Sequence, residues 1–235
     1  MKKVIIALIL MIGYLHLTGQ KLIVNGCVGY GLYQLKDLKN FQTDLKNSMQ
    51  PLQVASLEKF PDFLNYTLAM EYSRNGNSFF GITTSFYTTG ARNHLKDYSG
   101  EYKLDMILSG YRLGLQFRTI LERWNKFDFN FEMKGGIIFS TLSVSEMTQI
   151  VNVSDHSDSF DFRSRTIFWE PSFRLNYSIS SKLLVEFAVG YELNIDSSIY
   201  SKDNHDYDLT NWNGDLVHLN WSGARFMVGI GYSLF

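Results

Sequence analysis

His218 and Ser222, near the end of the chain, are a pair of residue types that could support nucleophilic catalysis. A histidine activates a serine when the reacting atoms lie about 3 Å apart. The residues between them favour an extended strand, in which positions four apart share a face but lie about 13 Å from each other. The spacing therefore argues against a catalytic pair, and we expect His218 to be a rim residue with Trp221 as an anchor at the membrane interface.

Two acidic segments contain a histidine and are candidates for binding a divalent cation. His205 lies among Asp203, Asp206 and Asp208, and His156 lies between Asp155 and Asp158. Neither spacing matches the pattern of a calcium loop, and acidic loops are usually solvated. The sequence has no identifiable zinc spacing, phosphate loop or paired-carboxylate site, so we expect no metal, no cofactor and no catalytic residue.

The segments that carry these residues are predicted to be strands, because apolar and polar side chains alternate with a period of two. The clearest case opposes Phe127, Phe129 and Phe131 to Asp128 and Asn130. Eight segments show the pattern: 26–34, 64–74, 80–86, 107–118, 127–140, 167–179, 185–195 and 224–235. Eight strands in one chain of this length favour a single antiparallel barrel, an all-β fold.

The connections between these strands alternate in length. Strands two and three are joined through Asn75-Gly76, a strong hairpin signal, and strands four and five and strands six and seven by similarly few residues. The other connections, 35–63, 91–101, 148–161 and 201–215, are longer and more polar. Short turns at one end and long loops at the other predict an up-and-down barrel with both termini at the short-turn end.

The polar face of the strands carries five basic and five acidic residues, and their placement decides which face meets lipid. They are Arg112, Arg118, Lys134, Arg174 and Arg225 with Glu71, Glu132, Glu170, Glu186 and Glu192. An arginine or lysine facing lipid costs about 2–4 kcal/mol, so five would exceed the roughly 5–15 kcal/mol of a typical fold. We therefore expect all ten to face inward as an ion-pair network that leaves little open lumen.

A soluble eight-stranded barrel is the competing interpretation, with the apolar face inward around a ligand. The residue types favour the membrane barrel, because a soluble exterior should carry many Lys and Glu. Here the polar face is rich in Gly, Ser, Asn and Ala, and the chain has 18 Phe and 14 Tyr but only 3 Pro. Aromatic girdles and glycine-rich walls are typical of transmembrane barrels.

One segment breaks the period of two. Leu35, Leu38, Phe41, Leu45 and Met49 recur at steps of three and four before Pro51, which predicts an amphipathic helix in the first long loop. We expect this helix to pack over the mouth of the barrel; a helix in the outer leaflet or against a partner is the alternative.

The ends of the chain and its charge add to this prediction. Residues 1–20 have Lys2 and Lys3 followed by an apolar run too short to span a membrane, which predicts a signal peptide before a barrel at 21–235.

Cys27 is the only cysteine and cannot form an internal disulfide; we expect it to fill the interior. The net charge of −1 gives no indication of nucleic-acid binding.

Together the strands, the loops and the C-terminal phenylalanine resemble the small eight-stranded outer-membrane β-barrel family, of OmpA/OmpX type and PorT-like. Tyr111-Arg112-Leu113-Gly114 and Gly229-Ile230-Gly231-Tyr232 resemble its wall strands. The resemblance implies the outer membrane of a Gram-negative-type bacterium, contact with its lipid, and a C-terminal assembly signal at Tyr232 and Phe235 for the barrel-assembly machinery. In the family pattern the residue two before the final Phe shares its face, and Ser233 departs from that pattern.

Roles within such a family diverge widely. We expect a non-enzymatic barrel whose exposed loops bind an unidentified extracellular or periplasmic partner or stabilise the envelope. A narrow, porin-like channel or a secretion- or transport-associated barrel is the alternative. A lipid-modifying enzyme acting from the rim is less favoured, because His218 and Ser222 do not match the His-x-Ser pattern of lipid A deacylases.

Overall fold

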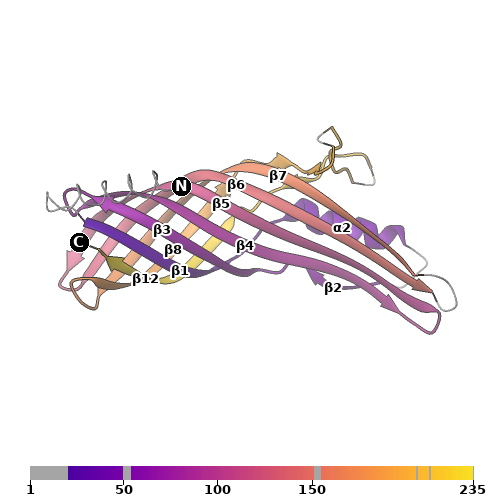
Figure 1. The fold of residues 1–235 in the computed structure, drawn as a ribbon, viewed down its shortest axis with the longest axis horizontal. Helices are drawn as coiled ribbons and strands as arrows, with labels where there is room; N and C mark the ends of the chain where they lie inside the picture. Colours follow the sequence, from indigo (N-terminus) through magenta and orange to yellow (C-terminus); the bar gives the residue numbers. More distant parts are fainter. Residues whose placement is uncertain (1–20, 50–53, 151–154, 205, 212, 235) are drawn as a thin grey trace, which may run out of the picture.

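A computed structural model describes residues 21–49, 54–150, 155–204, 206–211 and 213–234, so the predicted signal peptide at 1–20 lies outside the described residues. Eight strands form the wall of a barrel, all pairing antiparallel (Figure 1). They are β1 (Lys21–Gly31), β3 (Phe63–Ser73), β4 (Ser78–Lys96), β5 (Gly100–Trp124), β6 (Phe127–Ile150), β7 (His156–Ser178), β8 (Leu183–Asn194) and β12 (Gly223–Ser233). The ring runs β7-β6-β5-β4-β3-β1-β12-β8 and closes where β8 pairs with β7.

The predicted fold class, an all-β, eight-stranded antiparallel up-and-down barrel with a short helix in the first long loop, is therefore confirmed. The helix, α2 (Lys36–Ser48), follows β1, with Asp37 in its first turn and Lys46 in its last, as the helix dipole favours. The predicted hairpin at Asn75-Gly76 is also present, and Gly76 adopts the positive φ of 71° that this turn requires.

The wall has the polarity of a protein in lipid. On β5 the outward Leu113 and Leu115 are 52% and 71% exposed, whereas the inward Arg112 and Gln116 are 1% and 3% exposed. The same alternation continues around the ring, where nearly all exposed large side chains of the wall are aliphatic or aromatic. A surface of this kind is stable against acyl chains and unstable in water, which excludes the soluble-barrel alternative.

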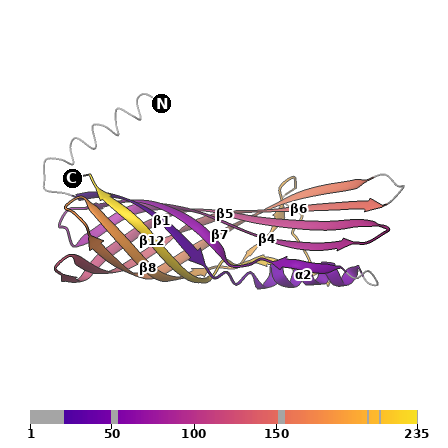
Figure 2. The ribbon, with the colours of Figure 1, turned by 90° about the horizontal axis from the view of Figure 1, so that it is seen from below.

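Strands β4 to β7 do not stop at the barrel mouth, and here the predicted loops are wrong. We expected loops at 91–101 and 148–161, but β4 and β5 stay paired to Lys96 and Glu101, and the described ends of β6 and β7 reach Ile150 and His156. A 25-residue strand such as β5 is about 80 Å long, whereas a transmembrane strand needs about 9–11 residues. The strands therefore continue well beyond the membrane, and Figure 2 shows them extending past the closed part of the barrel.

The polarity of the strands inverts where they leave the barrel, which explains the error. On β5 the inward positions beyond Gly110 are Leu108, Met106 and Leu104, all buried, and the outward ones include Lys103 and Asp105. The membrane pattern thus ends at this level and a water-soluble pattern begins, although the backbone ladder continues. A strand predicted from apolar residues on one constant face ends at this inversion, which is why the predicted strands are too short.

These inward apolar side chains form the core of a small folded unit, which we call the cap (residues 32–62, 91–109, 141–166 and 195–222). It also contains α2 and four short strands: β2 (Ala55–Lys59), β9 (Ser197–Ser198), β10 (Tyr200–Ser201) and β11 (His218–Leu219). Leu35 and Leu38 are fully buried in this core beside Leu104, Met106 and Leu108. The helix packs against β2, β4 and β11. Figure 2 shows it beyond the barrel mouth, lying alongside the extended strands rather than across the opening as we expected.

Candidate functional site: the sealed lumen

The lumen of the barrel contains all ten charged residues that the sequence assigned to it, and each is at most 4% exposed. They form one chain of alternating charge. From the short-turn end it runs Arg118, Glu71, Arg174, Glu132, Lys134, Glu170, Arg112, Glu192 and Arg225, and Glu186 joins it at Arg174. Sequence analysis found the members of this network but not their order.

The distances in this chain are those of direct ion pairs. The Arg118 Nη2 lies 2.5 Å from Glu71 Oε2, Arg174 Nη2 lies 2.5 Å from Glu132 Oε2, and Lys134 Nζ lies 2.9 Å from Glu170 Oε1. Arg112 contacts both Glu170 and Glu192. Four of the five carboxylates lie between two cations, and Glu186 pairs with Arg174 alone. Charges buried this deeply are tolerable only with such close partners.

Three aromatic residues, Tyr33, Tyr87 and Trp221, close the cap end of the lumen, and we call them the aromatic plug. The Trp221 ring lies 5.0 Å from the Tyr33 ring and 5.3 Å from the Tyr87 ring, between ring centroids. Trp221 is fully buried, and its Nε1 donates a hydrogen bond of 2.9 Å to Ser140 Oγ on β6. The expectation that Trp221 anchors the rim at the membrane surface is therefore wrong.

The plug is joined to the ion-pair chain. Arg225 Nη2 donates to the backbone oxygen of Trp221 at 2.8 Å, and Tyr87 Oη donates to Glu192 at 3.0 Å. The Arg225 guanidinium also lies 4.7 Å from the centre of the Tyr33 ring, within range of a cation–π interaction. A methyl group at Gly110 would lie 3.0 Å from the Tyr87 ring and 3.1 Å from the Trp221 indole, closer than an ordinary van der Waals contact, so the plug packs tightly against β5 at this glycine.

The cavities agree with a filled lumen. A cavity inside the wall, lined by Cys27, Lys134 and Met227 among others, measures about 10 Å³, room for about one water molecule. A second, of about 70 Å³, opens at the short-turn end beside Arg118 and Lys182. Cys27 is thus an interior side chain, as expected.

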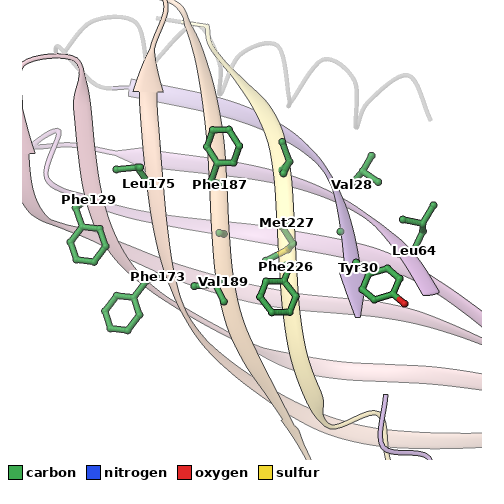
Figure 3. Close-up of a pocket in the computed structure, with 13 residues that line it drawn as sticks. Val28, Tyr30, Leu64, Phe129, Phe173, Leu175, Phe187, Val189, Phe226 and Met227 are labelled. Atoms are coloured by element: carbon green, nitrogen blue, oxygen red, sulfur yellow. The ribbon is translucent and has the colours of Figure 1, made fainter. Parts of the chain in front are cut away.

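A further hollow lies on the outer wall. It measures about 680 Å³ and crosses β6, β7, β8, β12, β1 and β3 (Figure 3). Its lining includes Phe173, Phe187, Val189 and Phe226, which are 47–50% exposed, with Ala188 and Met227 between them. Because the phenylalanine and valine side chains face outward, the hollow is part of the lipid-facing surface.

The candidate catalytic residues at the rim do not meet. The His218 Nδ1 lies 3.5 Å from Asp37 Oδ2 on α2, whereas Ser222 Oγ accepts a hydrogen bond of 2.9 Å from the Asn194 backbone. His156 Nε2 pairs with Asp158 at 2.9 Å, and His205 lies outside the described residues. Among the described residues no group of three or more His, Cys, Asp or Glu side chains could hold a metal ion.

The predicted assembly signal is described only in part. Tyr232 on β12 faces outward and is 47% exposed, opposite Val24 on β1. Phe235 lies outside the described residues.

These features define the class: the protein is a small eight-stranded β-barrel of the outer membrane, with an apolar lipid-facing wall, a filled polar lumen and a folded cap. No described helix is long and apolar enough to cross a membrane. No family model and no curated protein sequence matches the chain.

Several solved structures are similar to the chain over most of its length. OprG from Pseudomonas aeruginosa is 12% identical over 92% of this chain and 97% of that chain, with a TM-score of 0.44. Neisserial surface protein A is 9% identical over 91% and 98%, with a TM-score of 0.39. The attachment invasion locus protein Ail of Yersinia pestis is 12% identical over 93% and 100%, with a TM-score of 0.35. We draw nothing about function from likeness of this degree.

Proposed function

We propose that the protein is a non-enzymatic, non-conducting outer-membrane barrel whose cap is a surface-exposed binding platform. The observation that carries the proposal is the filled lumen, in which the ion-pair chain and the aromatic plug occupy the route that a solute would take. Eight-stranded barrels have room for interior side chains and little else, which also disfavours the narrow-channel alternative.

The structure of the cap supports a binding role. Its four long strands, its helix and its own apolar core hold it as a folded unit rather than as separate loops. Tyr98 at the tip of the β4–β5 hairpin is 97% exposed, and Phe160 and Tyr207 are 56% and 68% exposed. Exposed aromatic side chains on a rigid support are common centres of protein interfaces.

The first experiment measures conductance in planar bilayers. The native protein is expected to show none of appreciable size, and so is Trp221→Phe, which keeps an aromatic ring in the plug. The double variant Arg112→Ala, Trp221→Ala breaks both barriers and is expected to conduct. Appreciable conductance by the native protein would overturn the proposal and favour the channel.

The second experiment tests where the cap lies. In a Cys27→Ser background, Tyr98→Cys is labelled with a membrane-impermeant maleimide on intact cells, and Lys182→Cys in the β7–β8 turn is the matched control. We expect the first to react on intact cells and the second only after lysis. The opposite result would place the cap in the periplasm, where it could not be a surface platform.

The third experiment concerns the enzymatic alternative. Lipid A from cells that overproduce the native protein is compared with lipid A from cells that overproduce His218→Ala. Identical acyl chains in both, and in cells without the protein, are expected. A change that depends on His218 would refute the non-enzymatic assignment.

A further inference from the structure

The charges of residues 21–235 are divided unequally between the parts of the molecule. The lumen is neutral, with five acidic and five basic residues, and the cap is acidic, with sixteen acidic and ten basic residues. The short-turn end has five basic residues and only two acidic ones, Glu122 and Asp128. This end is therefore the one part of the described chain with an excess of positive charge.

Four of these five basic residues have no ion-pair partner in the described part of the chain. They are Lys21, Arg74, Lys126 and Lys182, all exposed, and we call them the basic ring. The fifth, Arg123, pairs with Asp128 at 2.8 Å. An unpaired exposed cation is free to bind an anion from outside the protein.

The basic ring extends around the circumference of the barrel. Lys21 begins β1, Arg74 follows β3, Lys126 lies in the β5–β6 turn and Lys182 in the β7–β8 turn. Since these strands are distributed around the closed sheet, each side of the barrel has a cation at this end. The short turns gather at the left of Figure 1.

Each of these cations is close to the edge of the apolar wall. Trp124 and Phe127, on either side of the β5–β6 turn, are 54% and 41% exposed, and Ile179 before the β7–β8 turn is 51% exposed. In a membrane these side chains lie at the level of the aromatic belt, where the acyl chains end. The turns beyond them therefore reach the headgroups. Lysine and arginine have stems long enough to place their charge there.

We propose that the basic ring binds the phosphate groups of anionic phospholipids in the leaflet at the short-turn end, which faces the periplasm in barrels of this class. The distribution of the cations favours lipid over a single protein partner, because headgroups surround the barrel on all sides whereas a protein would contact one sector. Arg74 can bind a phosphate with two parallel hydrogen bonds, and the lysines act as point charges.

The test uses the refolded full-length mature chain in phosphatidylcholine vesicles containing spin-labelled phosphatidylglycerol or spin-labelled phosphatidylcholine. The measured quantity is the association of the first lipid relative to the second. The ring variant is Arg74→Gln, Lys126→Gln, Lys182→Gln. The control removes three cap cations, Lys96→Gln, Lys103→Gln, Lys202→Gln, and heat-modifiable gel migration checks that each protein is folded.

For the native protein and the control we expect phosphatidylglycerol to be preferred roughly three- to fivefold at low salt. The preference should fall towards one in about 1 M salt, where the Debye length is about 3 Å. The ring variant should show a ratio of about one at all salt concentrations. Equal preference for phosphatidylglycerol in the native protein and the folded ring variant would overturn the proposal, as would an equal loss in the control. The lipid preference is measured without any ligand of the cap, so this test is independent of the proposed binding role of the cap.

Discussion

Gln42 on helix α2 and Asn93 on strand β4 are joined by two hydrogen bonds in the interior of the cap. Gln42 Nε2 donates to Asn93 Oδ1 at 2.9 Å, and Asn93 Nδ2 donates to the backbone oxygen of Gln42 at 3.3 Å. The same Nε2 also donates to the backbone oxygen of Glu58 on β2 at 2.7 Å. Both amides are fully buried, so one side chain ties the helix to two strands.

Gln42→Leu should therefore loosen the helix. The change removes the Nε2 donor from the buried Asn93 Oδ1 and from the backbone oxygen of Glu58, at a cost of about 1–3 kcal/mol. Hydrogen exchange followed by mass spectrometry should show faster exchange over 36–48, with β5 unchanged in the barrel. The control Asn47→Leu lies on the exposed side of the same helix and should exchange like the native protein. Unchanged protection of 36–48 in Gln42→Leu would show that apolar packing alone holds the helix.

Glu71 is the carboxylate whose removal should be most harmful to the barrel. It accepts hydrogen bonds from Arg118, from Arg174 at 3.2 Å and from Gln116 at 2.5 Å. Glu71→Ala leaves the two buried cations without it, which should cost about 3–5 kcal/mol of unfolding free energy. Urea unfolding in vesicles measures the loss. The control Glu122→Ala removes an exposed carboxylate and should change stability by less than about 0.5 kcal/mol; equal effects would contradict the buried network.

Leu115 and Leu57 are similarly exposed, at 71% and 60%, but in different surroundings. Leu115 lies on the wall of the barrel and Leu57 on β2 in the cap. Leu115→Arg should destabilise the protein by about 2–4 kcal/mol, because it places a charge in lipid. Leu57→Arg should change stability by less than about 0.5 kcal/mol. Urea unfolding of the two variants compares them directly, and equal small effects would mean that β5 at Leu115 is not in the membrane.

Acid should open the distal part of the β4–β5 hairpin. A hydrogen bond from Lys96, together with one from His94, lowers the pKa of Glu101. Partial burial acts to raise the pKa of Asp105, but hydrogen bonds from Arg92 and Lys103 outweigh it, so that pKa is also lowered. A carboxylate whose pKa is lower in the folded state stabilises that state above its unfolded pKa, about 4, and this stabilisation is lost as the pH falls through the folded pKa.

The measurement is hydrogen exchange over 92–105 at pH 7 and pH 3, corrected for the intrinsic rate. We expect protection to be lost at pH 3 while the barrel part of β5 stays protected. In Glu101→Gln, Asp105→Asn the hairpin should already exchange faster at pH 7 and change little with pH. Equal corrected protection of the native hairpin at both pH values would contradict the prediction.

The sequence by itself determined the barrel and its orientation towards lipid. Alternation of side chains defines a strand locally, and the cost of facing five cations into lipid assigns the polar face to the lumen without any knowledge of contacts. The stripe from Leu35 to Leu45 likewise specifies the helix, because helical periodicity depends only on neighbours in the chain.

Only the tertiary structure decided the order of the ion-pair chain, the aromatic plug and the cap. Trp221 and Ser140 are 81 positions apart, and Arg112 and Glu192 are 80 apart, so their contacts depend on strand register around a closed ring. The continuation of β4 to β7 was also hidden, because the strands pass from lipid into water and the preferred face for apolar residues changes sides at that level. The alternation of apolar and polar residues in one segment reflects only the solvent around that segment. The long strands pass through both lipid and water, so one alternation pattern does not extend over their whole length.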